Sequence, residues 1–393
     1  MKSPAFVCLD TSTWAYLARD VGHDGGAVRV LSLLNGGDVI PFITGHHVLE
    51  LAQHESDREF EIRVAFLRTL KFVGFHRIKE EKANVGYVLE LRELEIRLLL
   101  ECPSISNKEL IERVREKLIN GFTTGAEFCA MNEEWWALYR KEFAPRMRAR
   151  EAEIASVTQI PTGNRKEKLP PPNSTKLRSR EEATKYIEAA TSFFAQHMEA
   201  HGDDMLRDLE KRLNSPEALS RSFHAEVIED GKNLYAQPGD PLENLLAHFG
   251  VKRSRLPKNA TIEDVGYEAT FVGNMQIHER RLALPAGALA EIRQDDLPSW
   301  IVWREVDRAM KNHLLTAEGS SLADKMIVSF GLYLDGIELD KRLVESVRQS
   351  VGRGEMLRDL YARVFRRKNW KQVGDLLNEI RRTDSNHSPR PNL

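Results

Sequence analysis

Four acidic residues have the types and positions expected of a metal-binding site: Asp10, Glu50, Asp324 and Asp340. Asp10 ends the apolar run at residues 5–9, and Asp340 ends a short strand pattern that begins at residue 334. Both precede helical patterns, so we predict them at the carboxyl ends of strands, where open α/β sheets form their sites. Hard divalent cations prefer carboxylate oxygens and water as ligands. These acids therefore predict a site for Mg²⁺ or Mn²⁺.

Glu50 and Asp324 are predicted inside helices rather than at strand ends. Glu50 falls in the second turn of the helix that follows a strand pattern at residues 39–43, and Asp324 falls in the first turn of the helix before the last strand. Polar neighbours often orient metal ligands or a metal-bound water from outside the coordination sphere. The residues predicted in this role are Thr11, Ser12, His47 and Ser321.

Each aspartate also has a structural interpretation as a helix cap. An Asp at the start of a helix commonly accepts hydrogen bonds from the first backbone N–H groups. This interpretation covers Asp10 and Asp340, and Asp324 has Ser321 at the spacing of a capping pair. An Asp→Asn exchange separates the two interpretations, because Asn caps nearly as well as Asp but is a poorer metal ligand.

A zinc site is a further alternative for the helix that carries Glu50. His47, Glu50 and His54 follow one another at i, i+3 and i+7, which brings three ligand types toward one helix face. Histidines that face solvent or the edge of the core explain the same spacing without a metal. Metal analysis of each histidine variant distinguishes the two.

The elements that position the acids come from both ends of the chain. Strand patterns at residues 5–9, 39–43 and 72–78 alternate with helical patterns, which is typical of an α/β unit. Pro41 needs a place where no ladder N–H is required. Helical patterns then dominate from about residue 85, and the α/β pattern returns at residue 298.

This organisation predicts one domain interrupted by a long insertion. Residues 1–84 and 298–383 form the α/β domain, residues 85–297 form a helical insertion, and residues 384–393 form a disordered tail.

Composition narrows the class of protein. The 393 residues include 57 Lys or Arg and 59 Asp or Glu, for a net charge of -2, so no global field attracts nucleic acid. The three cysteines are widely spaced, which favours a reducing compartment. No apolar run reaches the roughly 18–20 residues that span a bilayer. We therefore predict a soluble cytoplasmic protein without a membrane partner.

Local basic segments supply the charge that the whole chain lacks. Residues 138–180 carry 11 Lys or Arg against 4 Glu, and a second basic stretch follows residue 363. Lysine and arginine bind nucleic-acid phosphates, although an exposed helix face or solvated loop has the same composition. The residues predicted to contact nucleic acid are Arg148, Arg150, Arg165, Lys166, Arg366 and Arg367.

Three segments resemble the PIN-domain ribonuclease family: residues 6–12, 41–51 and 319–342. The resemblance covers about residues 1–80 and 298–350. It implies a three-layer α/β/α fold with a central parallel sheet, in which Asp10, Glu50, Asp324 and Asp340 bind the metal. The chain departs from the family at Ser321, where relatives often carry another acid, and at Leu339, where a small hydroxyl residue is common.

The resemblance also implies an activity, which is hydrolysis of RNA phosphodiester bonds by a metal-activated water. DNA carries the same phosphate, so it stays open as a substrate. By analogy alone, the protein is a toxin or defence effector with a neutralising protein partner or inhibitor. The alternative is a catalytically weak PIN-like scaffold that binds nucleic acid or a protein through its helical insertion.

Overall fold

The structure is a computed structural model that describes residues 4–54, 56–78, 85–143, 181–189, 191, 229–234, 236–312 and 325–383. The chain divides into two compact units. The first comprises Met1–Arg148, Asp295–Leu315 and Ser320–Leu393, and the second comprises Ala149–Gln294 and Thr316–Gly319. The helices of residues 85–143, which were predicted to belong to the insertion, lie in the first unit.

A parallel sheet of four short strands forms the centre of the first unit, so the predicted α/β class with a parallel sheet is confirmed. Its strands, in spatial order, are β2 (Val39–Pro41), β1 (Ala5–Cys8), β5 (Gly336–Glu338) and β6 (Val364–Phe365). Val7 pairs with Pro41 on one side and with Gly336 on the other. Phe42 donates its N–H to Val7 O at 2.8 Å, so the nitrogen of Pro41 faces away from β1, as its missing donor requires.

Two strand assignments differ from the sequence prediction. Residues 72–78 contribute β3 (Val73–Phe75), but β3 pairs antiparallel with β4 (Gly121–Thr123) in a separate two-stranded sheet. No strand is predicted after residue 340, but the two residues that follow α17 (Glu355–Arg363) form β6 beside β5. A strand of two residues is too short to show a periodic pattern, so its pairing depends on tertiary contacts.

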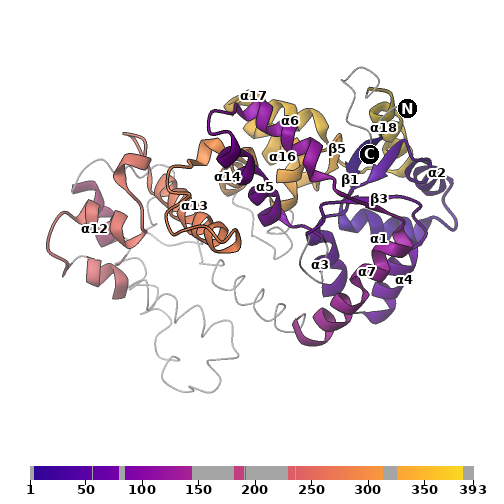
Figure 1. The fold of residues 1–393 in the computed structure, drawn as a ribbon, viewed down its shortest axis with the longest axis horizontal. Helices are drawn as coiled ribbons and strands as arrows, with labels where there is room; N and C mark the ends of the chain where they lie inside the picture. Colours follow the sequence, from indigo (N-terminus) through magenta and orange to yellow (C-terminus); the bar gives the residue numbers. More distant parts are fainter. Residues whose placement is uncertain are drawn as a thin grey trace. The chain divides into compact units, whose positions relative to one another are not determined.

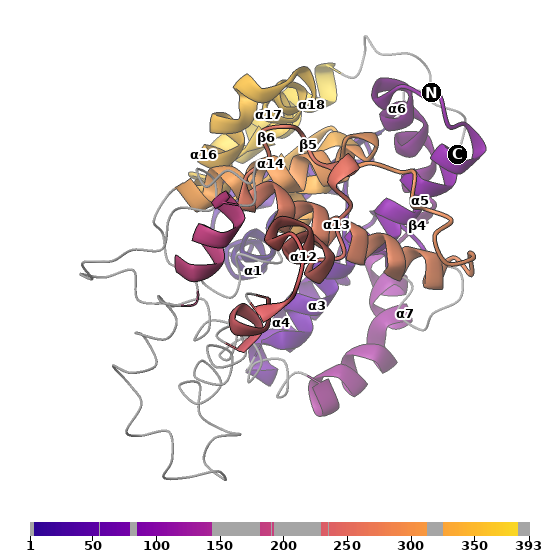
Figure 2. The same ribbon diagram turned by 90° about the vertical axis from the view of Figure 1, so that its left-hand side faces the viewer.

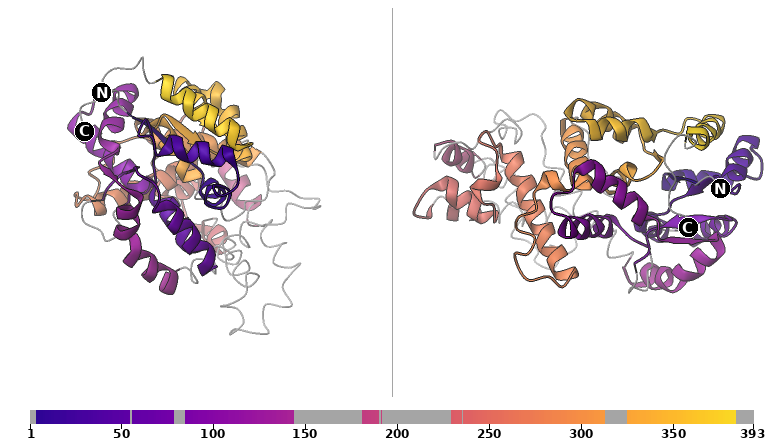
Figure 3. Two further views of the ribbon diagram at one scale, coloured as in Figure 1. Left: turned by 90° about the vertical axis from the view of Figure 1, so that its right-hand side faces the viewer. Right: turned by 45° about the horizontal axis from the view of Figure 1, so that its top comes forward.

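Helices surround the four strands of the first unit (Figures 1 and 3). They are α1 (Thr11–Asp20), α2 (Gly25–Leu34), α3 (Gly45–Gln53), α4 (Asp57–Leu67), α5 (Val88–Glu101), α6 (Asn107–Leu118), α7 (Gly125–Leu138), α14 (Pro298–Asn312), α16 (Lys341–Ser350), α17 and α18 (Trp370–Thr383). Helix α18 packs along α2, and α14 packs along α16. Figure 2 shows α3 and α4 side by side, below α14 and α18.

One hydrophobic core joins the two ends of the chain. Val7 of β1 and Leu17 of α1 belong to the same buried cluster as Trp370, Val373 and Leu377 near the C-terminus. Because burial of apolar side chains is the main force that drives folding, these contacts close the first unit around the sheet.

The second unit has a hydrophobic core of its own. Its described helices include α12 (Pro241–His248) and α13 (Ile262–Arg281). Leu242, Leu245 and Leu246 of α12 pack with Val265 of α13 and with Ala183. The described part of this unit is helical, in agreement with the helical patterns of this stretch.

Candidate functional site

Asp10 and Asp340 follow neighbouring parallel strands at one edge of the sheet. Cys8 of β1 pairs with Ile337 of β5, and the two aspartates come just after these strands. Asp10 Oδ1 accepts a hydrogen bond from Ser12 N at 2.7 Å, and Asp340 Oδ1 accepts one from Leu343 N at 2.7 Å. Both aspartates are therefore helix caps. Each cap uses one carboxylate oxygen, so capping and metal binding are compatible roles.

Glu50 is oriented by the residue that follows Asp10. It lies half-buried on α3, and its Oε2 accepts a hydrogen bond from Thr11 Oγ1 at the start of α1. Thr11 therefore contacts one of the predicted metal-binding carboxylates, as expected of a residue that orients it. Ser12 is exposed and acts through its backbone N–H on Asp10.

His47 fastens the helix of Glu50 to the end of β1. Its Nδ1 accepts a hydrogen bond from Thr44 N at 3.2 Å, so Nε2 carries the ring hydrogen and donates to Leu9 O at 2.9 Å. Burial lowers the pKa of His47 to about 4, so the ring is neutral. His47 therefore positions the backbone before Asp10 rather than the carboxylate of Glu50. Both ring nitrogens are engaged by protein atoms, which opposes the zinc alternative.

Glu338 is a buried acid at the same edge of the sheet, and it is absent from the acids predicted from the sequence. It is the last residue of β5 and is 4% exposed. Its Oε2 accepts a hydrogen bond from Asp10 N at 3.3 Å, and its Oε1 accepts one from Thr13 Oγ1 at 2.7 Å. The signal that could have identified it is a glutamate between Ile337 and Leu339, inside the short strand pattern that begins at residue 334.

The described acids act on one another electrostatically. Burial, together with the negative charge of Asp10, raises the pKa of Glu338 to about 7. Burial also raises the pKa of Cys8, and the charges of Asp10, Glu338 and Glu50 raise it further. The two ends of the chain therefore concentrate negative charge around the carboxyl ends of β1 and β5.

Six of the predicted site residues lie outside the described part of the chain. They are Asp324, Ser321, Arg148, Arg150, Arg165 and Lys166. Within the described ranges, no three His, Cys, Asp or Glu side chains are grouped so that they could hold one ion. Of the predicted basic residues, Arg366 is exposed, and the Arg367 guanidinium lies over the ring of Tyr16.

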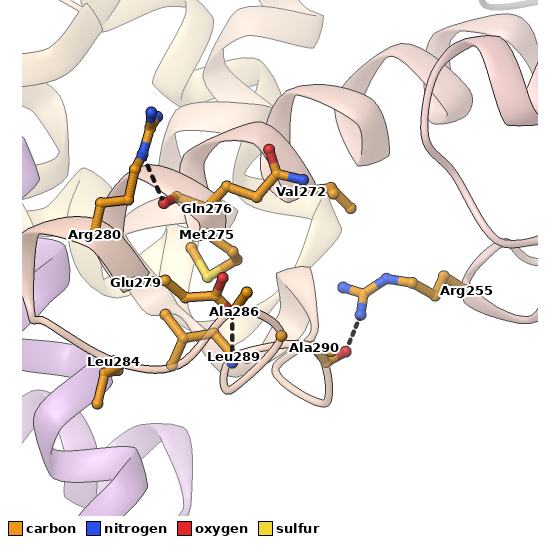
Figure 4. Close-up of a pocket in the computed structure, with 11 residues that line it drawn as sticks. Arg255, Val272, Met275, Gln276, Glu279, Arg280, Leu284, Ala286, Leu289 and Ala290 are labelled. Atoms are coloured by element: carbon orange, nitrogen blue, oxygen red, sulfur yellow. Dashed lines mark hydrogen bonds between the residues drawn. The ribbon is translucent and has the colours of Figure 1, made fainter.

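The second unit contains a cavity of about 500 Å³ beside α13. Figure 4 shows that Met275, Leu284 and Leu289 present apolar side chains to it. Two polar side chains at the cavity, Glu279 and Arg255, bind the backbone at residues 289 and 290. Glu279 Oε1 accepts a hydrogen bond from Leu289 N at 2.9 Å, and the Arg255 guanidinium donates to Ala290 O. The cavity therefore offers apolar volume but no arrangement of catalytic groups.

Comparison with models of protein families, with curated proteins and with solved structures finds no match for this chain. The PIN-like family therefore stays a prediction from the segments quoted above. Among the described helices, none combines the length and the apolar character needed to cross a bilayer.

The buried carboxyl of Glu338 is expected to make the stability of the first unit depend on pH. Its pKa of about 7 in the folded state lies above the ordinary value of 4.5. The stabilising contribution of this group is therefore complete below about pH 4.5 and is lost as the pH rises through 7. Glu338→Gln removes this titration. As the pH rises from about 4.5 to 7, the free energy of unfolding of the variant should therefore increase by roughly 2–3 kcal/mol relative to that of the wild type.

Urea unfolding of both proteins across this pH range, in buffer with EDTA, measures the difference. Glu345→Gln is the matched control, because Glu345 lies on the surface of α16, where it pairs with Arg348 at 2.6 Å. A constant offset between Glu338→Gln and the wild type at every pH would contradict the buried titration.

Proposed function

We propose that this chain is a divalent-metal-dependent endoribonuclease with a PIN-like, three-layer α/β/α domain and a helical insertion. The observation that carries the proposal is the meeting of acids from opposite ends of the chain. Glu338, 328 residues after Asp10, accepts the hydrogen bond of the Asp10 backbone N–H. Glu50 reaches the same region through Thr11. We infer that Asp10, Glu50 and Asp340 belong to one site, with Asp324 as the predicted fourth member.

The donor groups suit a hard divalent cation such as Mg²⁺ or Mn²⁺. They are carboxylates. The pKa of Glu338 is raised by burial and, to a smaller extent, by repulsion from Asp10, and a bound cation offsets that repulsion. Asp10, Glu50, Asp324 and Asp340 would hold the ion, and Glu338 adds a further carboxylate. The bound ion supplies an activated water and charge stabilisation for phosphodiester hydrolysis.

The other residues of the site keep these carboxylates in place. Thr11 orients Glu50, and His47 ties α3 to Leu9, next to Asp10. Thr13 binds Glu338 from the first turn of α1. Ligand positions fixed from outside in this way are typical of metal sites, where the supporting hydrogen bonds change affinity or activity by about 10–100-fold. The cytoplasm suits this proposal, since Cys8, Cys102 and Cys129 are free thiols.

A cleavage assay tests the proposal. Purified protein is incubated with labelled single-stranded RNA while Mg²⁺ or Mn²⁺ is titrated, and EDTA serves as the control. We expect cleavage that requires the metal and leaves internal cuts in the RNA. RNA binding without cleavage at any metal concentration would overturn the nuclease proposal and favour a binding scaffold. A single-stranded DNA of the same sequence shows whether the site discriminates by sugar.

A further inference from the structure

Strand β6 brings a basic residue to the edge of the sheet that carries the acids. Glu338 of β5 pairs with Phe365 of β6 in parallel register. Arg367 follows two residues after Phe365, so it leaves the sheet at the same edge as Asp10 and Asp340. Three adjacent parallel strands therefore deliver polar side chains to one place, which is the usual location of binding sites in open α/β sheets.

The Arg367 guanidinium is held in a defined position. It lies 4.0 Å from the ring centroid of Tyr16 and 5.2 Å from that of Trp370. The Trp370 ring is itself fixed, because its Nε1 donates a hydrogen bond to Asp20 Oδ2 at 3.1 Å. Aromatic faces attract a guanidinium through the ring quadrupole and keep its plane oriented.

The contact of Arg367 with the acidic site is electrostatic. Its Nε lies 4.0 Å from Glu338 Oε1, which is too long for a hydrogen bond. The contact therefore lowers the cost of the buried carboxylate without consuming the N–H donors of the guanidinium. The side chain is 23% exposed, so part of it is accessible from solvent.

We propose that Arg367 binds a phosphate of the RNA substrate beside the acidic site. This inference rests on the proposed nuclease function and assigns the residue that holds the negatively charged backbone next to the carboxylates. A guanidinium matches two phosphate oxygens with a fixed fork of donors, which a lysine cannot reproduce. Arg366 and Lys368, the neighbours of Arg367 in the sequence, are exposed and carry further positive charge.

The experiment measures RNA affinity separately from turnover. Fluorescence anisotropy with a labelled single-stranded RNA, in EDTA and at several salt concentrations, compares wild type, Arg367→Gln, Arg367→Lys and Arg348→Gln. Arg348 is the matched control because it also forms an ion pair, with Glu345, and lies in the last turn of α16, away from Asp340. We expect Arg367→Gln to weaken binding roughly tenfold and to reduce the salt slope by about 0.7. Arg348→Gln should change the affinity less than about twofold.

The lysine variant keeps the charge but loses the planar fork, so we expect it to bind more weakly than the wild type and more tightly than Arg367→Gln. Thermal melting shows whether Arg367→Gln folds. If it does not fold, the lysine variant alone tests whether Arg367 contributes to RNA binding. The Michaelis constant with Mn²⁺ gives the same comparison when affinity in EDTA is weak. If wild type cleaves RNA and the Arg367 variants match it in affinity and Michaelis constant, this inference is wrong and the proposed function stands. If wild type neither binds nor cleaves RNA, both fail.

Discussion

Asp10→Asn is expected to reduce metal-dependent RNA cleavage by at least about a hundredfold while the protein stays folded. The hundredfold scale is that of losing one preorganised charge-stabilising group from an active site. The structural role survives, because an Asn side-chain oxygen can accept the same hydrogen bond from Ser12 N. Cleavage rates at saturating Mn²⁺ and thermal melting of the same preparation measure the two effects separately.

Asp24→Asn is the matched control for this prediction. Asp24 caps α2 through hydrogen bonds from Gly26 N at 2.7 Å and Ala27 N at 3.2 Å, so it performs the capping role of Asp10 at another helix. Its substitution should leave both cleavage and melting temperature nearly unchanged. If Asp10→Asn cleaves RNA as fast as Asp24→Asn does, then Asp10 is only a cap and the metal site is not where we propose it.

Glu95→Ala is expected to lower the free energy of unfolding by about 3–5 kcal/mol, the range measured when one partner of a buried ionic network is removed. Glu95 is fully buried on α5 and accepts hydrogen bonds from Ser299 N at 2.9 Å and from the Tyr333 hydroxyl. Its charge also favours the guanidinium of Arg92, which lies buried 4.8 Å from the Trp300 ring centroid. Urea denaturation followed by circular dichroism measures the change.

Glu101→Ala provides the comparison on the same helix. Glu101 is exposed and faces Lys117 at 3.8 Å, so its removal should cost less than about 0.5 kcal/mol. Equal costs for the two substitutions would show that the Glu95 network does not hold α5 against α14. The network lies within the first unit, where it links α5 to Ser299 of α14 and to Tyr333.

The parts of the fold that could be predicted from the sequence are those with a local signal. Residues 5–9 are continuously apolar, which indicates a strand buried on both faces, and β1 lies there with β2 and β5 on either side. Asp10 and Asp340 each come just after a predicted strand. Parallel strands end at the same edge of a sheet, so the place of both aspartates at that edge followed from where the strands end. Pro41 was likewise expected where no ladder N–H is required, and its nitrogen faces away from β1.

The parts that could not be predicted depend on contacts between distant residues. Strand β6 has two residues and exists because Ile337 and Glu338 pair with it. A glutamate in a short apolar run looks like a boundary residue until its partners Thr13 and Asp10 are known. The placement of α5 in the first unit also could not be predicted, since the hydrogen bond from Ser299 N to Glu95 spans 204 residues.

The order of the strands has a consequence for synthesis of the protein in the cell. Strand β1 is translated first, but its neighbour β5 emerges from the ribosome more than three hundred residues later. A nascent chain therefore cannot assemble the acidic edge until β5 has been translated. Products that terminate before residue 336 lack both Glu338 and Arg367. If the chain is the nuclease that we propose, it cannot cut RNA before β5 and β6 have been synthesised.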